Sequence, residues 1–187
     1  MTRITRDSKC WNALPRSEEG HIGAYHCKVN TLSEIIKEFN PTIAAQTGLN
    51  AGHSAVLFLE FSNTILYSFD IGRWGSTAKA HEVLNKFFPK RHFYIKGDSA
   101  VTLKDFDTKV DFAFVDGGHT EDACYADIVN FDKIVKVGGI MIIDDLAIPG
   151  VGAAVQKFNW ANYEELPISK YKHGYINGIK IFKKLKD

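Results

Sequence analysis

The chain has 187 residues, of which 45% are hydrophobic and 24% are charged, and its formal net charge is +1. These values fit one globular α/β domain, and the small net charge argues against a broad electrostatic surface for nucleic acid or an anionic membrane. No apolar run approaches the roughly 20 residues of a membrane-spanning helix. Residues 1–10 also lack the apolar core of a signal peptide, so we expect a cytoplasmic protein.

The elements that the sequence predicts alternate between helix and strand after residue 30. Residues 1–30 show no clear period and are expected to form an irregular arm, and Thr31 is the predicted N-cap of the first helix. The alternation is typical of a doubly wound, mostly parallel α/β sheet. We divide the chain into an arm and helix, 1–40, and a domain, 41–187. Predicted helices cover 31–39, 55–61, 76–88, 120–135 and 152–158. Predicted strands cover 42–45, 65–69, 92–95, 112–115, 140–143, 163–168 and 178–184, the last two as an antiparallel pair.

Two apolar runs near the middle of the chain each end abruptly in acid. The first leads into Asp116, and the second leads into Asp144 and Asp145. Ligands of open α/β sheets bind outside the carboxyl ends of the strands, so these three acids are expected at one rim. Acids that merely end a strand would explain one such position, but they explain three converging positions poorly. The rim is therefore the predicted binding site.

A glycine-containing loop follows the first strand, and an acid ends the second. Gly48 and Gly52 let the backbone approach a ligand at a helix N-terminus, and Asp70, 22 residues after Gly48, can accept hydrogen bonds from ribose hydroxyls. Asn50 takes the middle position of the loop and the third glycine is missing, which disfavours a dinucleotide. Two alternatives stay open at this point: a nicotinamide-dependent oxidoreductase and a loop that binds nothing.

The phrase Val115-Asp116-Gly117-Gly118-His119, followed by Asp127 and by residues 138–145, is similar to motifs of a known family. The chain resembles the class I S-adenosylmethionine-dependent methyltransferases, above all the small-molecule O-methyltransferases of the metal-dependent catechol type and the macrolide-sugar type. The resemblance covers roughly residues 42–184. It implies a Rossmann-like, seven-stranded sheet and an enzyme that methylates a small hydroxylated acceptor.

The resemblance also implies roles for individual residues. A divalent metal, Mg²⁺ or Mn²⁺, would be held by Asp116, Asp144 and Asp145, which suits the oxygen ligands that these ions prefer. Gln46 stands where the family usually has an acid, so it keeps a hydrogen-bond acceptor but lacks the charge. The residues implied to bind S-adenosylmethionine are Gln46, Gly48, Asn50, Gly52, Ser54, Asp70, Ile71, Asp98, Ser99 and Asp116.

His119 and Asp116 are the candidate catalytic residues. His119 is either a general base or metal neighbour beside Asp116, or a cap of the helix that follows. Asp127 is expected to be solvated or bonded to a loop, and Lys180, Lys183, Lys184 and Lys186 are expected to be solvated.

Asp116-Gly117-Gly118 replaces the Asn-Pro-Pro type of motif found in enzymes that methylate nucleic-acid bases, so we expect no nucleic-acid partner. The acceptor pocket is expected to be either open or completed by a second subunit in a homodimer. A non-catalytic relative that keeps the fold as a binding module is a further alternative, suggested mainly by Gln46.

Overall fold

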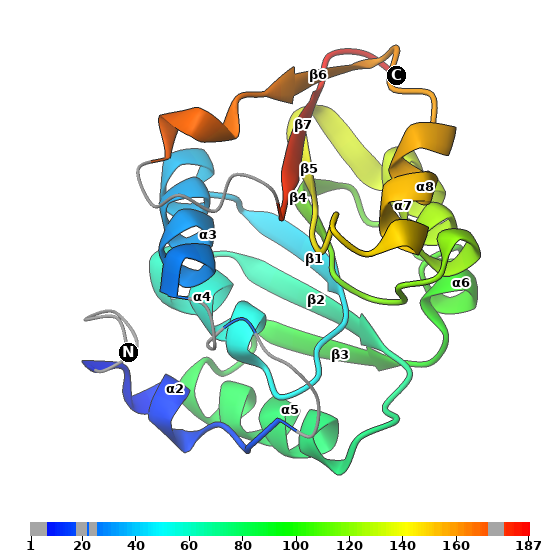
Figure 1. Ribbon diagram of the computed structural model, residues 1–187. Coiled ribbons are helices and arrows are strands. Elements are labelled where there is room, and N and C mark those ends of the chain that lie inside the picture. Colours follow the sequence, from blue (N-terminus) through cyan, green and yellow to red (C-terminus); the bar gives the residue numbers. More distant parts are fainter. Residues whose placement is uncertain (1–6, 18–21, 23–25, 172–177) are drawn as a thin grey trace.

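Seven strands lie in one sheet in the order β3-β2-β1-β4-β5-β7-β6 (Figure 1). The computed structural model describes residues 7–17, 22, 26–171 and 178–187. The strands are β1 (Ile43–Thr47), β2 (Ile65–Asp70), β3 (His92–Lys96), β4 (Val110–Val115), β5 (Val135–Ile143), β6 (Tyr163–Leu166) and β7 (Lys180–Lys184). The helices are α2 (Lys9–Ala13), α3 (His26–Phe39), α4 (His53–Phe61), α5 (Gly75–Phe87), α6 (Ser99–Thr102), α7 (Glu121–Ile134) and α8 (Pro149–Lys157), with a 3₁₀ turn, η2 (Ile168–Lys170).

The first five strands of the sheet are parallel, and the last two are antiparallel. β7 pairs with β5, and β6 pairs with β7. The predicted Rossmann-like sheet with a C-terminal antiparallel pair is therefore confirmed. The four apolar residues that end β5, residues 140–143, are fully buried, as expected for a strand covered on both faces. The strand order reverses between β1 and β4, which puts the expected ligand crevice at their carboxyl ends.

Helices cover both faces of the sheet. Figure 1 shows α3 and α4 on one side, and α6, α7 and α8 on the other. On the first face, Phe58 of α4 packs edge-on against Phe112 of β4, with 4.9 Å between the ring centroids. On the second face, Ile128 and Phe131 of α7 are buried with Met141 of β5. Burying side chains of this size stabilises the fold by about 1.5–3 kcal/mol each, so these two layers hold the strand ends in place.

The first long helix begins earlier than the sequence predicts. α3 starts at His26, so Thr31 lies buried inside the helix and the prediction of Thr31 as N-cap is wrong. The hydroxyl of Ser33 donates to the carbonyl of Val29 (2.7 Å), one turn before it. Val29 and Lys28 are both buried, and their tertiary contacts stabilise a first turn whose local sequence does not predict it.

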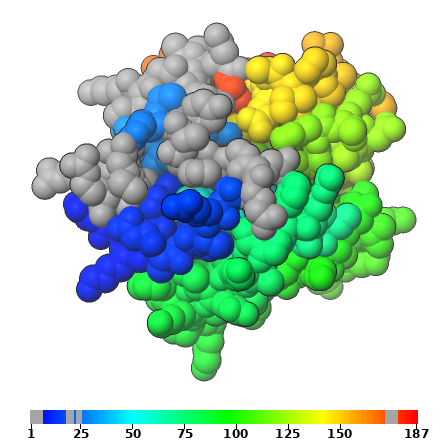
Figure 2. All heavy atoms as spheres, turned by 60° about the horizontal axis from the view of Figure 1, so that its bottom comes forward, coloured from blue at the N-terminus to red at the C-terminus, as the bar shows by residue number. Residues whose placement is uncertain are grey.

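A short helix also occurs in the region expected to be irregular. Ser8 is the N-cap of α2, and its hydroxyl accepts a hydrogen bond from the amide of Trp11 (2.9 Å). The ring of Trp11 lies edge-on to that of His53, with 4.8 Å between the centroids. α2 contacts α4 and α5, and Figure 2 shows the described N-terminal residues beside the green surface of α5. The arm therefore packs against the helix that follows the glycine loop.

Lys184 corrects a second expectation. Its side chain is buried rather than solvated, and its ammonium donates to the carbonyls of Asp132 (2.9 Å) and Val135 (3.2 Å). The end of β7 is thereby tied to the end of α7. Among the described residues, no helix combines the length and the apolar character needed to cross a bilayer.

Candidate functional site

The glycine loop lies directly against the residue that follows β4. Gly48 has a φ of 81°, and a side chain there would place its Cβ 2.0 Å from the carbonyl oxygen of Asp116. The amide of Gly48 donates to the carbonyl of Phe69 (2.8 Å), which ties the loop to β2. Gly52 has a φ of 86° at the start of α4, where backbone N–H groups point toward a ligand. The loop therefore brings backbone close to the carboxyl ends of both β2 and β4.

Asp70 organises this loop. Its Oδ2 accepts hydrogen bonds from the amides of Leu49 (2.8 Å) and Asn50 (2.9 Å), and its Oδ1 accepts one from Gly72 (2.7 Å). A carboxylate has about four acceptor positions, so Asp70 can bind the loop and still accept from a ligand. Ile71, the next residue, is 62% exposed.

Gln46 and Ser54 meet beneath the loop. The hydroxyl of Ser54 donates to Oε1 of Gln46 (3.2 Å), and Gln46 is fully buried. Within the described residues, Nε2 of Gln46 has no hydrogen-bond partner. A carboxylate at this position would be a buried charge, whereas the amide offers a donor and an acceptor at a lower cost of desolvation.

Asp98 and Ser99 lie two strands away from β1, at the end of β3. Asp98 is the N-cap of α6, and its Oδ1 accepts from the amide of Ala100 (2.9 Å). Ser99 is the first residue of that short helix. The sequence predicts this region to border adenine, and the structure places it along the same edge of the sheet as Asp70.

Asp127 is buried against the loop that follows β4, so of the two expected environments the solvated one is wrong and the one beside a loop is found. A Cβ on Gly117 would lie 2.9 Å from Oδ2 of Asp127 and 3.0 Å from the side chain of Thr47. Burial raises the pKa of Asp127 to about 6, although the Ser99 and Thr47 hydroxyls act in the opposite direction. The carboxylate of Asp127 is therefore packed against the loop at Gly117.

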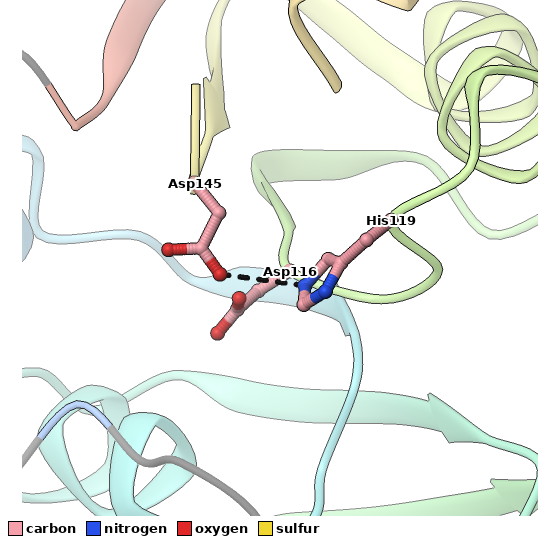
Figure 3. A group of neighbouring side chains, drawn as sticks. All are labelled: Asp116, His119 and Asp145. Atoms are coloured by element: carbon pink, nitrogen blue, oxygen red, sulfur yellow. Dashed lines mark ion pairs between the residues drawn. The ribbon is translucent and has the colours of Figure 1, made fainter. Parts of the chain in front are cut away.

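Asp116, Asp145 and His119 converge at the ends of β4 and β5 (Figure 3). One ligand atom of each lies within 4.8 Å of the others, and Nε2 of His119 is 3.3 Å from Oδ2 of Asp145. The N-cap of α7 is Thr120, whose hydroxyl accepts from the amide of Ala123 (3.3 Å). The interpretation of His119 as the helix cap is therefore wrong, because its side chain faces Asp145.

Asp144 faces a lysine that the sequence analysis did not single out. Lys28 of α3 forms an ion pair with Oδ2 of Asp144, and its ammonium is 3.3 Å from Oδ1 of Asp145. Burial lowers the pKa of Lys28, but the charges of Asp116, Asp144 and Asp145 raise it by more, so it stays protonated. Burial raises the pKa of Asp144 to about 6. The hydrogen bond from His119, together with Lys28, lowers the pKa of Asp145.

A signal for Lys28 does exist in the sequence. It lies one helical turn before Leu32 and two turns before Ile35, on the apolar face of its helix. A lysine on such a face needs a buried counter-charge. The helix predicted from the sequence starts at Thr31, and Lys28 therefore lies outside it.

Residues 45–146 match a protein family described as a methyltransferase domain. The matched residues run from β1 through the glycine loop to the acids after β5. The chain belongs to this methyltransferase family. The match favours a methyltransferase over the nicotinamide-dependent alternative.

Solved structures share the fold of this methyltransferase at low sequence identity. The methyltransferase PaMTH1 from Podospora anserina, bound to S-adenosylhomocysteine, is 16% identical, with a TM-score of 0.69 over 98% of this chain and 85% of that chain. An O-methyltransferase from Bacillus cereus, also with S-adenosylhomocysteine, is 14% identical, with a TM-score of 0.69 over 91% and 84%. TomG from Streptomyces achromogenes, an O-methyltransferase of tomaymycin synthesis in complex with S-adenosylmethionine, is 14% identical, with a TM-score of 0.65 over 85% and 80%.

The metal ligands predicted for this methyltransferase do not come together as one set. Asp116 and Asp145 converge, but the side chain of Asp144 is fully buried and its Oδ2 faces the ammonium of Lys28. Oδ1 of Asp144 accepts a hydrogen bond from the amide of Asp145 (2.8 Å). The catechol-type set of three carboxylate or amide ligands therefore does not fit this chain. The described residues offer a different group of three, in which His119 takes the place of Asp144.

A hollow lies between the segment after β5 and the strands β6 and β7. Leu146, the residue after Asp145, is part of its lining, and its amide donates to the carbonyl of Gly178 (3.1 Å). The volume is about 540 Å³, within the range of small-molecule sites. The lining combines apolar and polar side chains and includes one ion pair: Leu146, Glu165, Leu166, Pro167, Ile168, Ser169, Ile179 and Lys180.

Proposed function

We propose that this protein transfers the methyl group of S-adenosylmethionine to a hydroxyl oxygen of a small acceptor, with His119 as the general base. One observation carries the proposal: the glycine loop is in backbone contact with Asp116, beside the pair formed by His119 and Asp145. A cofactor seated on the loop would therefore have its reactive end next to a base. The family match and the fold shared with methyltransferases support the same reaction.

The cofactor would extend along the carboxyl ends of β1, β2 and β3. Gln46 and Ser54 would border its methionine part, Asp70 would accept hydrogen bonds from the ribose hydroxyls, and Asp98 with Ser99 would border adenine. The strand order β3-β2-β1 supports this arrangement, because it puts the three groups in sequence along one edge of the sheet.

His119 is placed to accept the proton of the acceptor. In the neutral tautomer that donates from Nε2 to Asp145, Nδ1 would be the basic nitrogen. S-adenosylmethionine would supply an electrophilic methyl group and leave as the neutral thioether, and Nδ1 of His119 would take the hydroxyl proton of the acceptor. The protein contributes mainly position and electrostatics to this direct displacement.

The acceptor is best sought among small hydroxylated molecules. The hollow beside Leu146 supports this class, because its apolar side chains fit a ring and the Glu165–Lys180 pair offers polar contacts. The net charge of +1 favours such a molecule over a nucleic acid.

Calorimetric titration with S-adenosylhomocysteine tests the cofactor, with NAD as the control ligand. We expect S-adenosylhomocysteine to bind and NAD not to bind. Asp70→Asn should weaken binding by about tenfold or more, since it loses charge-assisted hydrogen bonds at the loop. Asp107→Asn, an exposed acid elsewhere on the surface, should bind like the parent. Failure of the parent to bind S-adenosylhomocysteine would overturn the proposal.

Metal-assisted transfer is a second candidate, and the group of Asp116, His119 and Asp145 favours it. A divalent cation bound there would lower the pKa of the acceptor hydroxyl. Turnover that a chelator abolishes and Mn²⁺ or Mg²⁺ restores would favour this candidate. Turnover that persists in chelator would favour His119 alone.

A further inference from the structure

We propose that the ammonium of Lys28 is a built-in cation at the acidic strand ends, held where a divalent metal would need to bridge Asp144 and Asp145. The parent protein would therefore bind divalent cations weakly at this place, and removal of the lysine would create a site for them. The inference deepens the proposed function and rests on it only for the role of these strand ends. Cation binding itself is measured without turnover.

Lys28 and Asp144 form a buried ion pair. The side chain of Lys28 is 8% exposed and that of Asp144 is 0% exposed, so both charges are withdrawn from water. A buried charge is tolerated when a partner compensates it, and removing one partner of such a pair is strongly destabilising. α3 carries Lys28 to the end of β5 even though Asp144 lies 116 residues further along the chain. The pair therefore joins the N-terminal layer to the strand end.

Asp145 contacts both Lys28 and His119 from an unusual backbone conformation. Asp145 has a φ of 56°, a left-handed conformation that is unusual for a residue with a side chain. In this conformation Oδ1 lies 3.3 Å from the ammonium of Lys28, and Oδ2 lies 3.3 Å from Nε2 of His119. Lys28 thus holds one oxygen of Asp145 and leaves the other directed at the imidazole. Lys28 is a positioning residue that acts on His119 through Asp145.

The positive charge of Lys28 lies beside three carboxylates. Three carboxylates act on Lys28, and the ammonium offsets one of their negative charges. A second cation between Asp144 and Asp145 would face the ammonium at close range, and one oxygen of each acid is already engaged by it. Ammonium and divalent metal therefore compete for the same oxygens.

Mn²⁺ binding, followed by the electron paramagnetic resonance signal of free Mn²⁺, tests the proposal on the parent and four variants of the full chain, one of which is Asp144→Asn. We expect Lys28→Met to bind Mn²⁺ about tenfold or more tightly than the parent, because it removes a competing charge. The double variant Lys28→Met/Asp144→Asn should return to weak binding, since a ligand is lost as well. Lys37→Met, on the exposed side of the same helix, is the matched control and should bind like the parent.

The fold of Lys28→Met needs its own measurement, because Asp144 loses its partner. If the variant unfolds in chelator, circular dichroism should show that Mn²⁺ restores the native spectrum. A folded Lys28→Met with no gain in Mn²⁺ affinity would overturn the inference, as would tight Mn²⁺ binding by the parent that Asp144→Asn abolishes. If the parent does not bind S-adenosylhomocysteine, the proposed function is contradicted. The inference about Lys28 and cation binding does not depend on that result.

Discussion

Gly48 is the residue at which the predicted cofactor loop and the acidic group meet. Its left-handed backbone and the carbonyl of Asp116 leave no room for a side chain. The sequence predicts a glycine that lets a ligand approach, and the structure adds that this glycine also lets β1 and β4 approach each other. One position thus serves both the fold and the site.

Gly48→Ala should cost more stability than the backbone strain alone explains. Gly138 is a matched control, because its φ of 85° is similar and a Cβ there would meet nothing within 4 Å. We expect Gly138→Ala to lower the free energy of unfolding by about 1–2 kcal/mol, the cost of the left-handed backbone. Gly48→Ala should lower it by more and also weaken S-adenosylhomocysteine binding. Urea unfolding and calorimetry measure both effects, and equal losses for the two variants would contradict the clash.

Asp127 should make stability depend on pH. Burial raises its pKa from 3.8 to about 6 in the folded protein, so the folded state holds the proton more tightly than the unfolded state does. The free energy of unfolding should therefore fall as pH rises from about 4 to about 6. Asp127→Asn should reduce this fall, to which Asp144 also contributes, and be more stable than the parent at pH 8 by about 1–3 kcal/mol. Identical pH profiles for parent and variant would show that Asp127 is not desolvated.

The elements differ in how far the sequence could predict them. β4 and β5 were predictable because each is an apolar run that is followed by acid. The acids that follow these two strands are also residues of the candidate site. The start of α3 was harder to predict, because Lys28 fits the apolar face of the helix only once its partner Asp144, from a distant part of the chain, is known. α2 was missed for a similar reason: its burial comes from contact between Trp11 and His53.

Trp11→Ala tests whether α2 supports the glycine loop. Leu14, just after α2, would lie 3.1 Å from a Cβ on Gly52, so the segment covers the start of α4. We expect a loss of about 3–5 kcal/mol in unfolding free energy, as for other large-to-small changes of buried aromatics, and weaker S-adenosylhomocysteine binding.

Trp160→Ala is the control for this prediction. Trp160 stacks on Phe182 of β7, with 3.6 Å between the centroids, away from the loop. The control should lose stability and keep its affinity for S-adenosylhomocysteine. Equal affinity in both variants would contradict a supporting role for α2.

At the scale of the whole molecule, strand order decides where the site can be. The reversal between β1 and β4 brings the loop after one strand against the acid after the other. The sequence could predict this rim because strand ends follow a general rule. The sequence could not predict which partner each acid contacts at this rim. Asp145 faces His119, and Asp144 faces Lys28.

The most direct test is transfer of a deuterated methyl group from S-adenosylmethionine to a panel of small hydroxylated acceptors, followed by mass spectrometry in the presence of chelator. The parent should transfer the label to an acceptor oxygen. His119→Ala should be slower by about 10²–10⁴-fold, the usual contribution of a general base, while binding S-adenosylhomocysteine like the parent. No transfer by the parent to any acceptor, or equal rates for parent and His119→Ala, would contradict the account.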